Sequence, residues 1–167
     1  MFRVVASIAA LMLIVVSGTT HSAQVADKNF HPKAVNPAFK NDTGPIVAVD
    51  AAHANFHTCD GRYIAFCELM RSDGYKVHSN KEKFTTDNLK NIDLLVIANS
   101  LNEKNVDPKQ NWATPILPAF SKGETDNLVA WVSEGGSLLL IADRMPFPGA
   151  VSDRALKVGV NWGNNYA

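Results

Sequence analysis

Apolar runs alternate with helix-period segments along most of the chain. Three almost continuously apolar runs are typical of parallel strands buried on both faces: IVAVD (46–50), DLLVIAN (93–99) and SLLLIAD (137–143). A more polar strand, expected nearer a sheet edge, is predicted at YKVHS (75–79). The segments between and after the strands predict helices at 61–74, at 85–92, after the capping box SKGE (121–124) and at 150–159.

This alternation predicts an α/β fold, a three-layer sandwich whose parallel, flavodoxin-like sheet has four to five strands. In that order the first strand lies centrally, with the second on one side and the third and fourth on the other. The fourth strand is then a hydrophobic edge, which proteins usually protect. Three explanations stay open: the tail VNWGNNYA (160–167) pairs with it, a partner covers it, or the sequence is truncated at its C-terminus and the missing segment covers it.

The N-terminus has the pattern of a secretory signal peptide. One cation, Arg3, precedes the apolar run Val4 to Val16, and small and polar residues follow. The run is too short for a relaxed transmembrane helix, which needs about 20 residues. We therefore predict an exported protein, periplasmic or extracellular, with a leader at 1–23, an extended linker at 24–44, a domain at 45–167 and no stable membrane span after cleavage. An uncleaved N-terminal anchor is the alternative.

Composition excludes some partners and predicts the cysteine state. Loss of Arg3 with the leader reduces the 16 basic residues by one, to 15, against 16 acidic residues, so no long-range field favours nucleic acid or an anionic membrane. The two cysteines are Cys59, just before the first predicted helix, and Cys67, inside it. A helical rise of about 1.5 Å per residue separates them by roughly 10 Å, so we predict two thiols unless the loop folds back.

Polar side chains gather where the predicted strands end. Because the carboxyl ends of parallel strands meet at one edge of the sheet, these side chains are expected to share a crevice. They are Asp50 after the first strand, Asn99 and Ser100 after the third, Asp143 and Arg144 after the fourth, and His53, Asn55 and His57 in the first loop.

A histidine held by a carboxylate titrates near neutrality and can act as a general base. The predicted catalytic residues are therefore Asp50, His53, His57 and Asp143, and the predicted ligand-binding residues are Asn55, Asn99 and Arg144. Each residue type also has a structural interpretation, because Asp caps turns, Asn stabilises its own loop and Arg is common on surfaces. Arg62 is a further anion-binding candidate, by a bidentate contact.

Two other chemistries stay open. A divalent metal could bind His53, His57 and Asp50, although no HExxH spacing is present. Cys59, near a helix N-terminus and histidines, could be a Cys-His nucleophile. No nucleotide cofactor is expected, because neither GxGxxG nor a lysine-containing phosphate loop occurs.

Five blocks resemble an uncharacterised bacterial domain family of the class I glutamine amidotransferase-like superfamily. They are DAAHANFHT, RYIAFCELMRSDGY, LLVIANS, WVSEGGSLLLIADRMPFPGA and KVGV, within about residues 45–160. The resemblance implies a flavodoxin-type fold and marks Asp50, His53, Asn55, His57 and Asp143 as the positions of interest. The family often has a histidine where this chain has Arg144, and no Cys-His-Glu triad is present, so glutaminase activity is not expected.

Three hypotheses follow, one of which is that the chain is a piece of a larger envelope protein whose missing portion supplies the activity. The other two give this domain a function of its own. The first is an exported, hydrolase-like domain acting on a small polar substrate at the crevice. The second is a non-catalytic module of the cell envelope that binds a small ligand, such as a sugar or an organic anion. Fold resemblance alone does not separate them.

Overall fold

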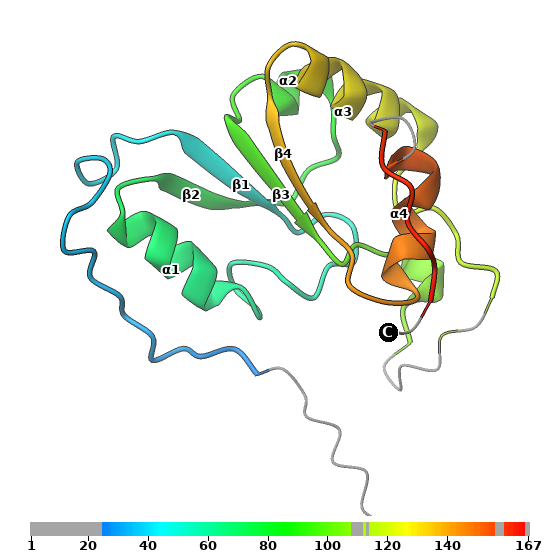
Figure 1. The fold of residues 1–167 in the computed structure, drawn as a ribbon, viewed down its shortest axis with the longest axis horizontal. Coiled ribbons are helices and arrows are strands. Elements are labelled where there is room, and N and C mark those ends of the chain that lie inside the picture. The colour runs from blue at the N-terminus through cyan, green and yellow to red at the C-terminus, as the bar shows by residue number, and fades with distance from the viewer. Residues whose placement is uncertain (1–24, 108–111, 113, 156–158, 166–167) are drawn as a thin grey trace, which may run out of the picture.

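The computed structural model describes residues 25–107, 112, 114–155 and 159–165 (Figure 1). The predicted leader at 1–23 lies outside these residues. Within them, no helix is long and apolar enough to cross a membrane.

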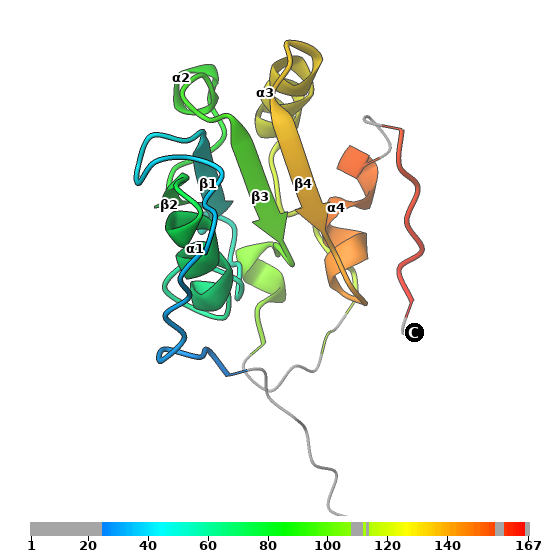
Figure 2. The same cartoon turned by 60° about the vertical axis from the view of Figure 1, so that its left-hand side comes forward.

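The sheet has four strands, all parallel, in the order β2-β1-β3-β4 (Figure 2). The strands are β1 (Ile46–Asp50), β2 (Lys76–Asn80), β3 (Leu94–Ala98) and β4 (Ser137–Ile141). This confirms the predicted parallel α/β class and the place of the first strand beside the second and third. Parallel pairing brings the carboxyl ends of all the strands to one edge of the sheet.

The helices follow the predicted order with shifted ends. They are α1 (Ile64–Ser72), α2 (Thr86–Leu89), the short 3₁₀ helix η1 (Glu103–Asn105), α3 (Lys122–Ser133) and α4 (Phe147–Ala155). The capping box before α3 is confirmed, because the Ser121 side chain accepts from the Glu124 N–H and the Glu124 side chain accepts from the Ser121 N–H. The described tail, 159–165, forms no strand and runs alongside α4 (Figures 1 and 2).

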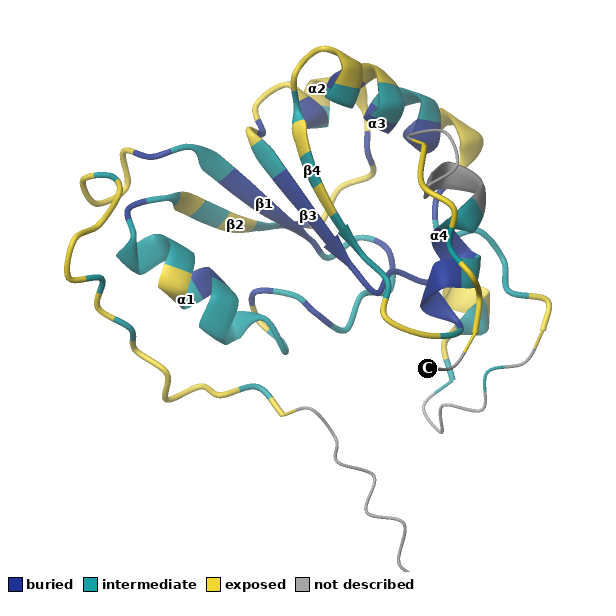
Figure 3. Cartoon of the chain, viewed as in Figure 1, coloured by how far each residue is buried: buried dark blue, intermediate teal, exposed yellow. Residues whose placement is uncertain are grey.

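Alternation of side chains along the strands builds a core on each face of the sheet. On one face, β1 and β3 pack against residues of α2, α3 and α4, in a cluster that includes Ala48, Leu95, Ile97, Leu89, Leu128, Trp131 and Val151. On the other face they pack against α1, in a cluster that includes Val47, Val49, Val96 and Cys67. Burial is deepest in β1 and β3, as Figure 3 shows, because both faces of these two strands are covered.

The two cysteines form a disulfide bond, so the prediction of two thiols is wrong. That prediction placed Cys59 along the axis of a helix beginning near residue 61. In the structure α1 begins at Ile64, and the residues before it form a turn in which the Gly61 and Tyr63 N–H groups donate to the Thr58 carbonyl at 3.0 and 3.1 Å. The turn folds Cys59 back over α1, so the Cα atoms of Cys59 and Cys67 lie 5.6 Å apart. With its sulfur bonded, Cys59 is not a free thiolate, and the Cys-His nucleophile hypothesis is wrong as well.

The segment before β1 contains no helix or strand between residues 25 and 45, and its end docks onto the α1–β2 turn. The Phe39 N–H donates to the Asp73 carbonyl at 3.1 Å, and the Phe39 ring contacts the Tyr75 ring with centroids 5.0 Å apart. This contact anchors the chain just before it enters the sheet.

Candidate functional site

The loop after β1 is built on short-range hydrogen bonds that also tie it to β3. The Ala52 N–H donates to the Asp50 carboxylate, and the His53 N–H donates to the Asn55 side-chain carbonyl at 3.0 Å. The Asn55 amide donates to the Ala98 carbonyl at 3.3 Å, and the Leu101 N–H donates to the His53 carbonyl at 2.9 Å. Asn55, a predicted ligand-binding residue, therefore stabilises its own loop in the structure.

His53 lies between two carboxylates in the interior. Its Nδ1 is 3.0 Å from both carboxylate oxygens of Asp50, and its Nε2 is 2.8 Å from Oε1 of Glu124. The His53 side chain is 0% exposed, and the rings of Phe84 and Phe120 lie 4.5 and 4.8 Å from its centroid. This Asp50-His53-Glu124 network joins the end of β1 to the first turn of α3.

Glu124 is the partner that sequence analysis assigned only a capping role. Burial raises the pKa of this carboxyl, but hydrogen bonds from the Ser121 backbone, from His53 and from the Ser121 side chain outweigh burial and bring the pKa to about 2. Glu124 is therefore ionised at neutral pH. An ionised carboxylate only accepts hydrogen bonds, so Nε2 of His53 donates to Oε1 of Glu124.

The network accounts for His53 without a substrate. Both ring nitrogens are engaged and the ring has no exposed surface, so His53 has neither a free nitrogen nor contact with solvent. A buried and fully hydrogen-bonded network of side chains fixes the elements that it joins.

The second predicted histidine lies in a different environment, among residues of the carboxyl edge. The rings of His57 and Tyr63 meet edge to face, with centroids 4.9 Å apart. Burial and then the Arg62 guanidinium lower the pKa of His57, and Asp143 opposes them in part. Burial and then Asp143 raise the pKa of Tyr63. His57 is therefore neutral at pH 7, and Asp143 belongs to its surroundings rather than to those of His53.

The remaining predicted residues divide between scaffold and surface. Asn99 adopts φ 51° at the end of β3, and its side-chain carbonyl accepts from the Asp143 N–H at 3.2 Å, which ties β3 to the β4–α4 turn. Arg144 is exposed, and its N–H donates to the Asp143 side chain at 2.7 Å. Asp50 and Asp143 thus lie at the same edge of the sheet with β3 between their strands, and Asp50 is buried whereas Asp143 is exposed.

The proposed metal set does not assemble. The ring nitrogens of His53 contact Asp50 and Glu124, so neither is directed at a site shared with His57. In the part of the chain that the structure describes, no group of three or more His, Cys, Asp or Glu is arranged to hold a metal ion.

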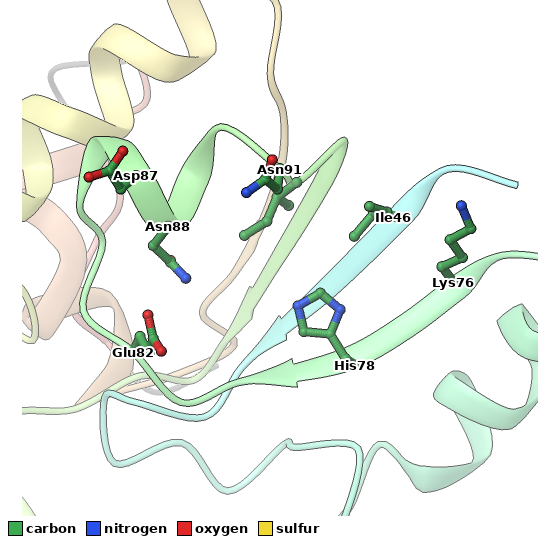
Figure 4. A pocket seen from close by; sticks show the side chains of 8 residues that line it. Ile46, Lys76, His78, Glu82, Asp87, Asn88 and Asn91 are labelled. Carbon is green, nitrogen blue, oxygen red and sulfur yellow. The ribbon is translucent and has the colours of Figure 1, made fainter.

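A groove lies away from all of these residues, between β2 and α2 (Figure 4). Its volume is about 490 Å³, within the usual range of small-ligand sites. Because α2 is only four residues long, it leaves the outer part of this sheet face open. The groove is lined by Ile46, Lys76, His78, Glu82, Asp87, Asn88, Asn91 and Ile92.

None of these residues was predicted from the sequence to form a site. The available signal was the polar alternation of β2, which predicted an edge strand but not what lies above it. Figure 4 shows the His78 ring projecting from β2 into the space bounded by Asn88 of α2 and by Glu82.

Comparison with protein-family models, with curated proteins and with solved structures found no match to this chain.

Proposed function

We propose that this protein is an exported module that binds a small polyhydroxylated ligand, such as a sugar, in the groove between β2 and α2. The observation that supports this most is the open groove of about 490 Å³, lined mainly by polar side chains. The family resemblance of the five sequence blocks stays a hypothesis beside it.

The chemistry of the lining favours hydroxyl groups over an organic anion. Asn88, Asn91 and Glu82 present planar amide and carboxylate groups, which suit hydrogen bonds to neighbouring hydroxyls, and Ile46 and Ile92 supply an apolar surface. The lining sets the Glu82 and Asp87 carboxylates against the single Lys76 ammonium, so it offers an organic anion no excess of positive charge. The Lys90 ammonium donates to the Asp87 carboxylate at 2.8 Å and compensates the charge of that carboxylate, and Lys90 is not one of the residues that line the groove.

Two observations support export. The sequence at 1–23 has the pattern of an apolar leader, and the described residues 25–45 that precede β1 contain no helix or strand. The Cys59–Cys67 disulfide is the cysteine state that persists in oxidising compartments outside the cytosol.

A hydrolase is the second candidate function, and it now depends on His57 rather than on His53. The lowered pKa of His57 keeps the imidazole neutral at pH 7, as a general base requires, and Asp143 acts on it electrostatically. A hydrolase of this kind would lose activity in a His57→Gln variant and keep it in a His78→Ala variant.

The binding proposal is tested by titrating the purified exported protein with a panel of neutral mono- and disaccharides. Chemical shifts of backbone amides and calorimetry report the site and the affinity. We expect shifts in β2 and α2, and about a tenfold loss of affinity in His78→Ala and in Asn91→Ala, since each removes one or two hydrogen bonds.

Matched controls are His31→Ala and Asn29→Ala, which change exposed residues of the segment before β1 and should leave affinity unchanged. Shifts confined to the carboxyl edge around His57 would move the site to that edge. The proposal would be overturned if none of the saccharides in the panel showed saturable binding.

A further inference from the structure

One edge of β4 presents backbone N–H and C=O groups that do not pair with β3. The Ser137 N–H donates to the Asp93 carbonyl at 3.2 Å, and the Ile141 carbonyl accepts from the Asn99 N–H at 2.9 Å. Because successive residues of a strand point to opposite sides, the N–H and C=O groups of Leu138 and Leu140 point away from β3. Within the described residues, no strand pairs with them on that side.

This edge lacks the features that usually protect an edge strand. The strand SLLLI contains no charge and no proline, and Leu139 is 42% exposed on the sheet face opposite α3 and α4. The opposite edge strand, β2, carries Lys76 and His78, and the Arg71 guanidinium donates to its Val77 carbonyl at 3.0 Å. One edge of the sheet is thus polar and covered by an arginine, whereas the other is apolar.

The described tail does not cover the β4 edge. Its Asn165 carbonyl accepts from the Met145 N–H at 3.0 Å, and its Asn164 side-chain carbonyl accepts from the Gly149 N–H at 3.0 Å. Both bonds hold the tail beside α4, where Figures 1 and 2 show it. Pairing of the tail with the fourth strand, one of the three explanations left open by the sequence, is therefore not found in residues 159–165.

We propose that this edge binds the same edge of a second copy of the chain, so that two sheets join into one across a two-fold axis at Leu139. In this antiparallel pairing, Leu138 of each copy lies opposite Leu140 of the other and exchanges backbone hydrogen bonds with it. Leu139 of one copy lies opposite Leu139 of the other, in a non-hydrogen-bonded pair, where side chains of opposite strands are closest. The exposed surface of both leucines therefore becomes buried.

Charge complementarity selects this register. Glu134 precedes β4 and Arg144 follows it, each five positions from Leu139 and each exposed. A two-fold axis at Leu139 therefore brings Glu134 of each copy to the same end of the interface as Arg144 of the other. A two-fold axis at Leu138 or at Leu140 would also align backbone groups. In either case, however, Glu134 of one copy would no longer lie opposite Arg144 of the other.

The self-association is tested by sedimentation equilibrium of the purified exported protein over a dilution series. We expect a reversible monomer–dimer equilibrium, and amides of Leu138 and Leu140 whose hydrogen exchange slows as protein concentration rises. Leu139→Lys places two ammonium groups face to face on the axis and should abolish the dimer. Leu69→Lys changes a leucine of α1 that is 49% exposed, and it should leave the dimer intact.

A charge reversal provides a second test that does not touch the apolar strand. Arg144→Glu alone, or Glu134→Arg alone, creates like-charge contacts and should weaken the dimer at low salt, whereas the double exchange should restore it. Monomer at every concentration would overturn the proposal. A dimer that all of these variants leave unchanged would also overturn it, because its interface would lie elsewhere.

Discussion

His53 illustrates how the same residue type changes its role with its surroundings. In the sequence it is a histidine beside a strand-ending aspartate, a pattern that favours proton transfer. In the structure a second carboxylate, Glu124, reaches the other ring nitrogen and closes the network. Removing one member of a buried hydrogen-bond network is costly because the remaining polar groups lose their partners.

We therefore expect His53→Gln to lower the free energy of unfolding by about 3 kcal/mol, since it breaks the hydrogen bonds that join the buried Asp50 and Glu124 side chains through the imidazole. Urea unfolding followed by circular dichroism measures the loss. His31→Gln, at an exposed position, serves as the control and should change stability by less than about 0.5 kcal/mol. Unchanged stability in His53→Gln would argue against a structural role for the network.

Glu124 makes stability depend on pH in the acid range. Its pKa is about 2 in the folded protein, below its ordinary value of 4.5, so the folded state holds the proton less tightly than the unfolded state does. The stabilisation is complete above pH 4.5 and is lost as the pH falls from 4.5 towards 2. We expect Glu124→Gln to be less stable by about 2 kcal/mol at pH 7, and to show a flatter stability profile across that acid range. Parallel profiles for the two proteins would contradict this assignment.

At the scale of the element, local rules explain where helices begin and end. The Ser121–Glu124 capping box starts α3 where the sequence predicted it. The first helix begins later than predicted, at Ile64, because a turn closed on Thr58 occupies the preceding residues. Gly74 then ends the α1 region with φ +96° and leaves space for the Phe39 backbone.

Gly74→Ala should therefore destabilise the fold by more than about 2 kcal/mol. A Cβ atom there would lie 2.3 Å from the Phe39 carbonyl oxygen, and the backbone conformation itself disfavours L-residues. Gly123→Ala is the matched control in α3, where nothing lies within 4 Å of the added Cβ. Since alanine favours helix, the control should raise stability by about 0.5 kcal/mol. Thermal unfolding compares the two, and equal effects would contradict the steric explanation.

At the scale of the whole molecule, the sheet order brings distant segments together at the carboxyl edge. β3 lies between β1 and β4, and the side chains of Asn55 and Asn99 connect the loops of these strands. The disulfide adds a covalent tie between the β1 loop and α1. Stability should therefore depend on the redox state of the solution.

We expect reduction of the disulfide, or a Cys59→Ser/Cys67→Ser double variant, to lower stability by about 2–3 kcal/mol. The bond closes a loop between residues eight positions apart, which restricts the unfolded chain. Denaturant unfolding with and without reductant measures the difference, and the double variant should be insensitive to reductant. A wild-type protein that reductant leaves equally stable would contradict the structural role of this bond.

Sequence patterns alone were sufficient for the α/β class, the parallel strands, the capping box and the edge character of β2, because these depend on local periodicity. Tertiary structure decided the pairing of His53 with Glu124, 71 positions away, and the groove between β2 and α2. It also decided the Cys59–Cys67 bond, because a turn rather than a helix precedes Ile64. The physical reason is common to all three. A side chain's charge, burial and partners depend on which elements pack together, and periodicity along the chain does not encode those contacts.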